Sequence, residues 1–272
     1  MVEYIAGLPL GFMHMPPARP WGINFGGGLN STAMIFECRS RGFRPDWILF
    51  ADTGSELPGT IEHVEKVRQW CEGWADVVTV RWERVLEPKG FEALHDNCIR
   101  TGYMPSKAYG YAGCTTKWKI QPMDRWRKEH DFQRGAFAVG YDADEKRRIT
   151  TACKRGDDPK FTAWYPLVAW GIGREKCREI VEAHGFTVGK SSCFMCPNMH
   201  DREWKELRET HPELFAKAKQ IEEQAIAKGN PGPRPGLRRG GGLLANLDVV
   251  VESPQMELEA LEDRCHHAGC FT

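Results

Sequence analysis

The chain has 272 residues, of which 41% are hydrophobic, so it is long enough to bury a substantial core. Its 37 basic and 37 acidic side chains give a net charge of +0, which excludes a global basic field for nucleic acids and leaves only local basic patches. No stretch approaches the roughly 18 consecutive apolar residues of a membrane span, and no basic region precedes the weak N-terminal apolar run. We therefore expect a cytoplasmic protein without membrane contact, whose 10 cysteines are metal ligands, catalytic groups or buried thiols.

Strand and helix signals alternate along the first half of the chain. Because strands that alternate with helices form parallel sheets, the pattern predicts an α/β sheet covered on both faces. Ligands of such sheets bind beyond the carboxyl ends of the strands. The expected strands cover 21–25, 46–51, 77–80 and 136–140, and the expected helices cover 31–41, 60–71 and 122–130.

Two loops follow the first two expected strands and should open onto the same crevice. The first contains Gly26, Gly27 and Gly28 and leads into a helix, where free N–H groups and the helix dipole favour an anion such as a phosphate. The second begins with Asp52 and supplies a carboxylate and a hydroxyl. The alternative for the first loop is an ordinary strand-to-helix turn with Ser31 as N-cap.

Four segments in order resemble motifs of one family. "GGGLNST" at 26–32 resembles the PP-loop, Ser-Gly-Gly-x-Asp-Ser-Thr, of the adenine nucleotide alpha hydrolases. "DTGSELPGT" at 52–60 and "CTTKWKIQP" at 114–122 are similar to the Asp-Thr-Gly and Cys-x-x-x-x-Lys segments of PAPS (phosphoadenosine phosphosulfate) reductases in that superfamily. With "KSSCFMCPNMHDREW" at 190–204, the resemblance extends from about Trp21 to Glu209, and it implies a Rossmann-like (HUP-type) parallel sheet with helices on both faces.

The resemblance also implies the roles of individual residues. Cys114, Lys119 and Asp52 are its catalytic candidates. The sequence departs from the PP-loop pattern at Leu29, where a lysine is common, and at Gly26 and Asn30, which replace serine and aspartate. These departures leave open whether the chain cleaves ATP or binds a nucleotide without cleaving it. The expected nucleotide contacts are Gly26, Gly27, Gly28, Asn30, Ser31, Thr32, Asp52, Thr53 and Gly54.

The cysteines indicate a metal centre. Cys193 and Cys196 form a Cys-x-x-Cys pair, a spacing that brings two sulfurs onto one metal or cluster. Cys114 lies at the upstream position where cluster-bearing family members carry a double cysteine, but its neighbour here is Gly113. The resemblance therefore implies a 4Fe-4S cluster held by three thiolates, with one iron open to a non-protein ligand. Alternatively, a fourth ligand comes from Cys153, Cys98 or a tail cysteine.

Two other interpretations of these cysteines stay open. Cys114, Cys193, Cys196 and His200 have a usable spacing for a closed Cys₃His zinc site, or the thiols are reduced and bind no metal. Cys177 lies on the apolar face of an expected helix, so we interpret it as a core residue.

Further charged residues follow the expected strand at 136–140. Asp142, Asp144, Glu145 and Arg147 would reach the ligand face, or form only a solvated charge run. Lys117 lies beside Cys114 and, like Lys119, could screen a cluster or hold an anionic substrate.

The expected organisation places a nucleotide-binding domain between two less regular ends. The C-terminal helical segment is expected to break near Pro212. Arg234, Arg238 and Arg239 in the following linker could touch a nucleic-acid backbone. Cys265 and Cys270 share the tail location of the nucleophile of cluster-free PAPS reductases without its motif. The boundaries are an arm at 1–20, a PP-loop α/β domain at 21–190, a Cys-x-x-Cys loop and helices at 191–228, a Pro/Gly/Arg linker at 229–242 and a tail at 243–272.

Three functions agree with these residues. The first hypothesis is an ATP-dependent sulfur-transfer enzyme that adenylates an acceptor and then thiolates it. The second is a sulfonucleotide reductase that releases sulfite from PAPS or adenosine phosphosulfate, and the third is a non-catalytic nucleotide-binding protein with a structural zinc. The expected ligands and partners are ATP or PAPS, Mg²⁺ as a companion of the nucleotide, a sulfur donor or reductant, a nucleic acid as one candidate acceptor, and a second copy of the chain in a homodimer.

Overall fold

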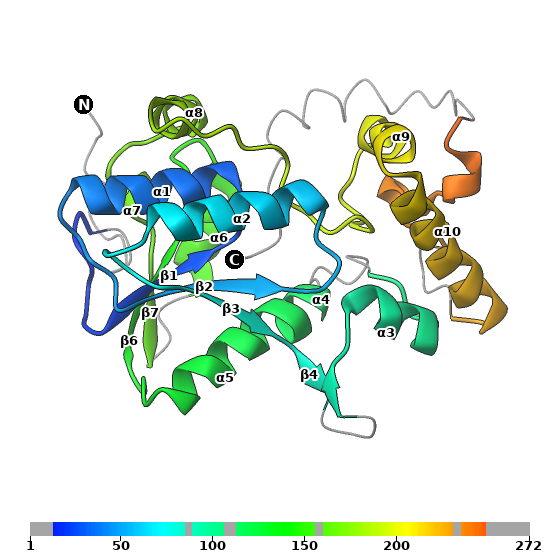
Figure 1. Ribbon diagram of the computed structural model, residues 1–272, viewed down its shortest axis with the longest axis horizontal. Helices are drawn as coiled ribbons and strands as arrows, with labels where there is room; N and C mark the ends of the chain where they lie inside the picture. The colour runs from blue at the N-terminus through cyan, green and yellow to red at the C-terminus, as the bar shows by residue number, and fades with distance from the viewer. Residues whose placement is uncertain (1–12, 85–88, 106–112, 156–159, 231–234, 249–272) are drawn as a thin grey trace.

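The computed structural model describes residues 13–84, 89–105, 113–155, 160–230 and 235–248, apart from the side chains of 153–155. A five-stranded, fully parallel sheet with the order β3-β2-β1-β6-β7 forms its centre (Figure 1). The α/β Rossmann-like prediction is therefore confirmed, with one more strand, β7, than the sequence analysis expected. The strands are β1 (Trp21–Phe25), β2 (Trp47–Asp52), β3 (Val77–Arg81), β6 (Gly135–Val139) and β7 (Phe161–Trp164).

Helices cover both faces of the sheet. Every residue of β1 and β2 is buried, as expected for central parallel strands that are packed on both sides. Helices α1, α2 and α8 lie on one face, and α5 lies on the other (Figure 1). The helices of this part are α1 (Leu29–Ser40), α2 (Pro58–Trp70), α5 (Gln121–Glu129), α6 (Lys146–Arg155), α7 (Pro166–Ala169) and α8 (Arg174–Ala183).

The main hydrophobic core, called the sheet core below, lies between the sheet and helices α1, α2 and α8. Trp21 and Trp164 meet edge to face in it, with ring centroids 5.3 Å apart. Its cysteines, Cys38, Cys71 and Cys177, are each 0% exposed, so the prediction that Cys177 is a core residue is confirmed. Burial raises the pKa of Cys71 and of Cys177 to about 12, so these thiols stay protonated at neutral pH.

A second core lies beyond the carboxyl ends of the strands, where α3, α9 and α10 pack together (Figure 1). Its fully buried members include Met195, Trp204 and Ile221. The chain turns between α9 and α10 at Pro212, as expected. The elements around this core are β4 (Glu83–Arg84), β5 (Gly90–Phe91), α3 (Leu94–Thr101), α4 (Gly113–Thr115), the π-helical η2 (Thr116–Ile120), α9 (Asp201–Thr210), α10 (Pro212–Ala227), and the 3₁₀ turns η3 (Arg239–Gly241) and η4 (Leu244–Asn246).

Residues 235–248, which include part of the expected linker, pack against this second core. Leu237 is 0% exposed, and the buried Glu222 carboxylate of α10 accepts the backbone N–H of Leu237 at 2.7 Å and of Leu244 at 2.9 Å. A segment rich in proline and glycine forms few hydrogen bonds of its own, and here apolar anchors and the Glu222 carboxylate contribute to holding it. No helix within the described ranges is long and apolar enough to cross a membrane.

Candidate functional site

A cavity of about 400 Å³ lies at the carboxyl ends of β1 and β6, where the strand order reverses. Such switch points are the usual ligand sites of open α/β sheets. The predicted site residues Gly26, Gly28, Asn30, Ser31, Lys119 and Cys196 line this cavity. The structure therefore brings the PP-loop-like turn, the lysine of the third motif and one cysteine of the Cys-x-x-Cys pair to one space.

The glycine turn shapes the floor of the cavity. Gly27 has φ 68°, a left-handed conformation that favours glycine, and Gly28 is the N-cap of α1 without a side-chain cap. The hydroxyl of Ser31 donates to the Gly28 carbonyl at 3.1 Å and accepts the Gly26 N–H at 3.3 Å. Ser31 therefore lies inside the helix and is not its N-cap. The first turn of α1 contains no acidic residue, so its N-terminal partial positive charge is available to an anion.

Gly140, at the end of β6, allows the opposite wall to come close. A Cβ atom at Gly140 would lie 2.9 Å from the backbone nitrogen and Cα of Ser31, closer than real Cβ contacts. Only a glycine therefore lets the loop after β6 contact the first turn of α1. This loop continues with Tyr141 and Glu145, which also line the cavity.

Asn30 has a partner that explains its departure from the PP-loop pattern. Its side-chain N–H group donates to the Asp142 carboxylate at 2.7 Å, and Asp142 is 1% exposed. Burial, followed by the nearby charge of Glu145, raises the pKa of Asp142. An aspartate at position 30 would face this carboxylate with like charge, whereas an asparagine donates a hydrogen bond to it.

Two buried polar atoms in the cavity wall have no hydrogen-bond partner among the described residues. They are the Oδ1 atom of Asn30 and the Oγ atom of Ser192. A buried polar atom without a partner costs about 1–3 kcal/mol, so such atoms often mark the place of a ligand or water. Both atoms could accept hydrogen bonds from a ligand in this cavity.

Four cationic side chains besides Lys119 line the same cavity, and the sequence analysis proposed a role for none of these four. Arg148 pairs with Glu145 at 2.7 Å and lies over the Tyr141 ring, 4.0 Å from its centroid. Arg147, which the sequence analysis named instead, is not in the cavity wall. Arg174 and Arg178 lie on α8, and Lys190 lies in the segment before the Cys-x-x-Cys pair. Their positions in the sequence do not indicate a site, because only the packing of these segments brings them to the cavity of the glycine turn. The four cations are Arg148, Arg174, Arg178 and Lys190.

The Asp-Thr-Gly loop does not line the cavity. The Asp52 carboxylate is buried and accepts two hydrogen bonds from Arg81, from Nε at 2.8 Å and from Nη2 at 2.7 Å. Its other oxygen accepts the Gly54 N–H at 2.7 Å. Asp52 and Gly54 therefore shape the loop, and neither contacts the same space as the glycine turn.

Glu56 is a site residue that the sequence analysis missed. Its side chain is 2% exposed, and its Oε1 atom lies 3.4 Å from the Lys119 Nζ atom and 3.5 Å from the Cys193 Sγ atom. The Thr53 hydroxyl donates to the same oxygen at 3.1 Å and lies 3.3 Å from the Cys193 sulfur. This buried carboxylate therefore joins the lysine in the cavity wall to the Cys-x-x-Cys pair. In the sequence, Glu56 is a single glutamate between the Asp-Thr-Gly residues and the proline of the second motif. Nothing in this local pattern indicates that its side chain is buried beside Lys119 and Cys193.

The backbone joins the same two loops. Glu56 and Cys193 form an isolated antiparallel bridge. The Leu57 N–H donates to the Ser192 carbonyl at 3.0 Å, and the Phe194 N–H donates to the Ser55 carbonyl at 2.9 Å. The Asp-Thr-Gly loop and the Cys-x-x-Cys loop are thus held together by both backbone and side-chain contacts.

The predicted metal-ligating cysteines gather in the second core. Cys193, Cys196 and Cys98 of α3 are buried members of this core, and Cys114 packs against the core as a half-buried residue. Burial raises the pKa of Cys98 to about 12, and Cys114 is the next contributor to that increase. No three His, Cys, Asp or Glu side chains in the described ranges are grouped as the ligands of a metal ion. In an iron–sulfur cluster each cysteine binds a different iron atom. Its sulfur atoms therefore need not lie as close together as the ligands of a single metal ion.

His200 has a structural role at the start of α9. It is the N-cap of that helix, and its backbone N–H donates to the Glu203 carboxylate at 2.7 Å in a capping box. The nitrogens of its ring lie 3.2 and 3.3 Å from Nη1 of Arg239. These contacts hold His200 at the helix end, where they support the tail segment.

Other candidates lie elsewhere or beyond the described part. Arg238, proposed as a contact to nucleic acid, pairs with Asp201 and donates to the Asn246 carbonyl at 2.8 Å. Its side chain is 12% exposed, so most of its surface is already occupied. Arg234, the side chain of Cys153, Cys265 and Cys270 lie outside the described residues.

Gly27 and Thr32, two of the expected nucleotide contacts, do not line the cavity: Gly27 borders a second space together with His63, and Thr32 is fully buried. The Thr32 hydroxyl donates to the Gly28 carbonyl at 2.9 Å and lies 2.8 Å from Nε2 of the buried His63. Because this hydroxyl donates to the carbonyl, the His63 ring donates to its oxygen. Burial, and then the charge of Lys66, lowers the pKa of His63 to about 4, which keeps the ring neutral. His63 therefore supports the turn from behind.

Comparison of the sequence with family models and with curated proteins found no match. The cavity and its residues consequently carry the functional argument.

Proposed function

We propose that this protein is an adenine-nucleotide-binding enzyme of sulfur chemistry, whose reaction is ATP-dependent sulfur transfer. The observation that carries the proposal is the single cavity that the PP-loop-like turn, Lys119 and Cys196 all line. An inert scaffold has no need for an anion-binding turn, a buried lysine and a thiol-rich loop at one place. The proposal also rests on the resemblance of four segments to the PAPS reductase family.

The nucleotide phosphates would lie over the first turn of α1. The N–H groups of that turn, together with Arg148 and Lys190, would neutralise their charge. The unpartnered oxygens of Asn30 and Ser192 would accept hydrogen bonds from the ribose or base. The cavity volume of about 400 Å³ is within the range of small-molecule sites.

The proposed reaction has two steps. An oxygen of the acceptor attacks the α-phosphorus of ATP, the bond to the β-phosphate oxygen breaks, and pyrophosphate leaves. A sulfur nucleophile then attacks the adenylated carbon, the carbon–oxygen bond breaks, and AMP leaves with the electron pair. The ammonium group of Lys119, held by Glu56 in the cavity wall, is placed to stabilise negative charge that develops on the phosphate.

Cys114, Cys193 and Cys196 are the residues that would hold a 4Fe-4S cluster. These residues suit a cluster because cysteine thiolates are the usual ligands of iron–sulfur clusters. All three belong to, or pack against, the same apolar core. When bound, the cluster would supply concentrated charge and iron–thiolate bonds that tie the two loops together. A zinc ion is the alternative occupant.

Sulfonucleotide reduction is the second candidate function, and Leu29 favours it. Leu29 lines the cavity at the position where family members that cleave ATP often place a lysine. In a reductase, a thiolate attacks the sulfonate sulfur of PAPS or adenosine phosphosulfate and the nucleotide leaves. A second thiol then forms a disulfide with the first and releases sulfite.

Titration calorimetry with ATP, PAPS and adenosine phosphosulfate tests the proposal. Gly28→Val should abolish binding of all three, because its Cβ atom would lie 2.5 Å from the Ser191 Oγ atom and its methyl groups would fill the cavity. Gly59→Val is the matched control, because a side chain there meets nothing within 4 Å. Unchanged nucleotide affinity in Gly28→Val would overturn the assignment of the cavity.

The preferred nucleotide separates the two candidate functions. Tighter binding of ATP than of the sulfonucleotides supports sulfur transfer, and the reverse order supports the reductase. Release of pyrophosphate in the presence of candidate acceptors then tests the first step directly.

A further inference from the structure

We propose that Cys98 of α3 is the fourth thiolate ligand of the iron–sulfur cluster assigned above to Cys114, Cys193 and Cys196. The inference rests on the proposed function, since that proposal supplies the cluster. It replaces a three-thiolate site by a closed four-cysteine site.

Location is the first argument. Cys98 is 3% exposed and belongs to the second core together with Cys193 and Cys196, while Cys114 packs against that core. The other cysteines with described side chains, Cys38, Cys71 and Cys177, lie in the sheet core. Of the alternatives for a fourth ligand, Cys98 is thus the one that the described fold brings to the other three.

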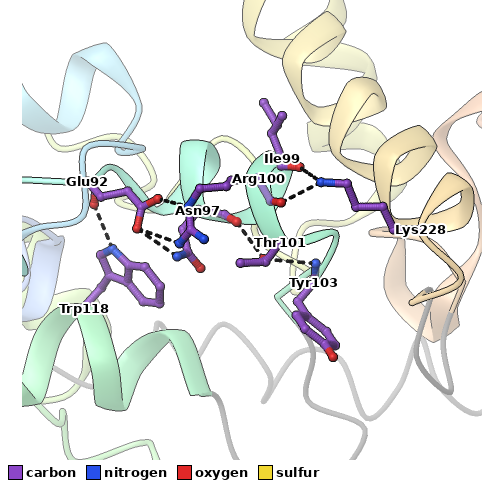
Figure 2. A network of polar contacts seen from close by, with 8 residues as sticks. All are labelled: Glu92, Asn97, Ile99, Arg100, Thr101, Tyr103, Trp118 and Lys228. Atoms are coloured by element: carbon purple, nitrogen blue, oxygen red, sulfur yellow. Dashed lines mark hydrogen bonds and ion pairs between the residues drawn. The ribbon is translucent and has the colours of Figure 1, made fainter. Parts of the chain in front are cut away.

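The fixed position of α3 is the second argument, and Figure 2 shows the contacts that hold it. At its carboxyl end, the Lys228 ammonium donates to the carbonyls of Ile99 at 3.0 Å and Arg100 at 2.6 Å. Before its first turn, the Glu92 carbonyl accepts the Trp118 indole N–H at 3.2 Å (Figure 2). The helix that carries Cys98 is therefore tied to α10 on one side and to η2, which follows Cys114, on the other.

A shared loop gives the third argument. The Leu94 N–H, at the start of α3, donates to the Thr53 carbonyl at 2.9 Å, and the His95 N–H donates to the Ser55 hydroxyl at 3.1 Å. The carbonyl of the same Ser55 accepts the Phe194 N–H of the Cys-x-x-Cys loop at 2.9 Å. One loop therefore holds both α3 and the Cys-x-x-Cys loop, so the two segments that carry Cys98 and the pair share one support.

The charges near Cys98 suit a cluster whose total charge is negative. The Lys117 ammonium lies 4.1 Å from the Trp82 ring centroid and 4.3 Å from that of Trp118. Its positive charge opposes the increase in the pKa of Cys98 that burial and Cys114 cause, and the net pKa stays raised. The Lys119 ammonium lies 3.4 Å from the Glu56 carboxylate, whose same oxygen is 3.5 Å from the Cys193 sulfur.

A closed site has a consequence for the proposed reaction. Four protein thiolates leave no iron open to a substrate sulfur. The sulfur nucleophile would then come from an external donor, such as a persulfide or inorganic sulfide, and the cluster would fix the two loops and the local charge.

The test uses the full-length protein purified without oxygen, with iron and acid-labile sulfide measured per chain. Cys98→Ala removes one ligand, so the variant should lose one iron of four on mild oxidation and give the electron paramagnetic resonance signal of a 3Fe-4S cluster. Cys98→Ser can still ligate through oxygen, and we expect it to keep four irons with a shifted reduction potential. Cys177→Ala is the matched control, because Cys177 is equally buried but lies in the sheet core.

Three results separate the possible failures. Wild-type protein without iron and sulfide would overturn the cluster and the Cys98 assignment, whereas the proposed nucleotide binding is tested separately by the calorimetry of Gly28→Val. A wild-type cluster that is lost in Cys114→Ala but stays a 4Fe-4S cluster, with unchanged signal and potential, in both Cys98 variants would overturn the Cys98 assignment alone. If Cys98→Ala fails to fold, as judged by circular dichroism, the potential and spectrum of Cys98→Ser decide.

Discussion

The sheet core and the second core both bury cysteines, and they bury them differently. In the sheet core, Cys38, Cys71 and Cys177 come from three helix segments, and the charges that act on their pKa values come from arginine, aspartate and glutamate side chains. In the second core, Cys114 is the leading charged neighbour of Cys98, and Cys193 lies within 3.5 Å of a buried glutamate. Burial alone therefore does not distinguish the two groups of cysteines, whereas a neighbouring thiol and a buried glutamate are found beside those of the second core.

Replacing cysteines in each core should give the largest difference between the two cores. The double variant Cys193→Ala/Cys196→Ala should lose nearly all bound iron, because it removes two ligands of one cluster and leaves no oxygen in their place. Cys38→Ser should keep its iron and lose stability instead, since it places a hydroxyl in an apolar core. Iron analysis and urea unfolding of the variants, prepared side by side, measure both effects. Full iron content in this double variant would remove the distinction between the cores.

A second, smaller effect concerns charge at the border of the second core. Glu56→Gln leaves the Lys119 ammonium, whose side chain is 9% exposed, without its carboxylate, and removing one partner of a buried pair typically costs about 3–5 kcal/mol. Glu65→Gln is the control, because Glu65 pairs with Arg68 on the exposed surface of α2, where such pairs contribute about 0–1 kcal/mol. The free energies of unfolding in urea give the comparison. Equal losses for the two variants would show that the Glu56 pair has no special place in the fold.

The smallest expected effect is a pH dependence of stability caused by His63, which supports the glycine turn from behind. His63 has a folded-state pKa of about 4 against an ordinary value of 6.5, so the unfolded chain binds its proton first as pH falls. Its contribution to stability is complete above pH 6.5 and is lost between pH 6.5 and about 4, by at most about 3 kcal/mol at about 1.4 kcal/mol per pKa unit. His63→Gln keeps an N–H donor for Thr32 and cannot titrate.

Unfolding curves at several pH values check this effect. The wild-type protein should lose more stability than His63→Gln over that pH range. Parallel pH profiles for the two proteins would mean that the environment of His63 does not lower its pKa.

Sequence patterns found the floor of the site but not its other walls. The glycines after β1 and the Cys-x-x-Cys spacing are local signals, and the cavity contains residues from both. Asp52 was expected in the site from its motif, yet Arg81, 29 positions away, takes up its carboxylate. Neither this pairing nor the turn of Arg174 and Arg178 toward the glycines has a local signal, because each depends on how distant elements pack.

The composition of the C-terminal segment was misleading for a physical reason. Proline and glycine content predicts that 229–242 does not fold by itself. The described part is nevertheless ordered by Leu237 and Leu244, which are buried, and by the Glu222 carboxylate that accepts their N–H groups. A linker composition excludes autonomous structure, but it does not exclude docking on a surface formed elsewhere.

The bridge between Glu56 and Cys193 also determines how the site can open. Because the Leu57 and Phe194 N–H groups donate across this bridge in opposite directions, neither loop can separate without breaking both hydrogen bonds. Their amide protons should therefore exchange with solvent at one common rate, as parts of one cooperative opening unit. A ligand that binds over the glycine turn would slow that exchange in a loop more than 160 positions further along the chain by about the factor 1 + [L]/Kd.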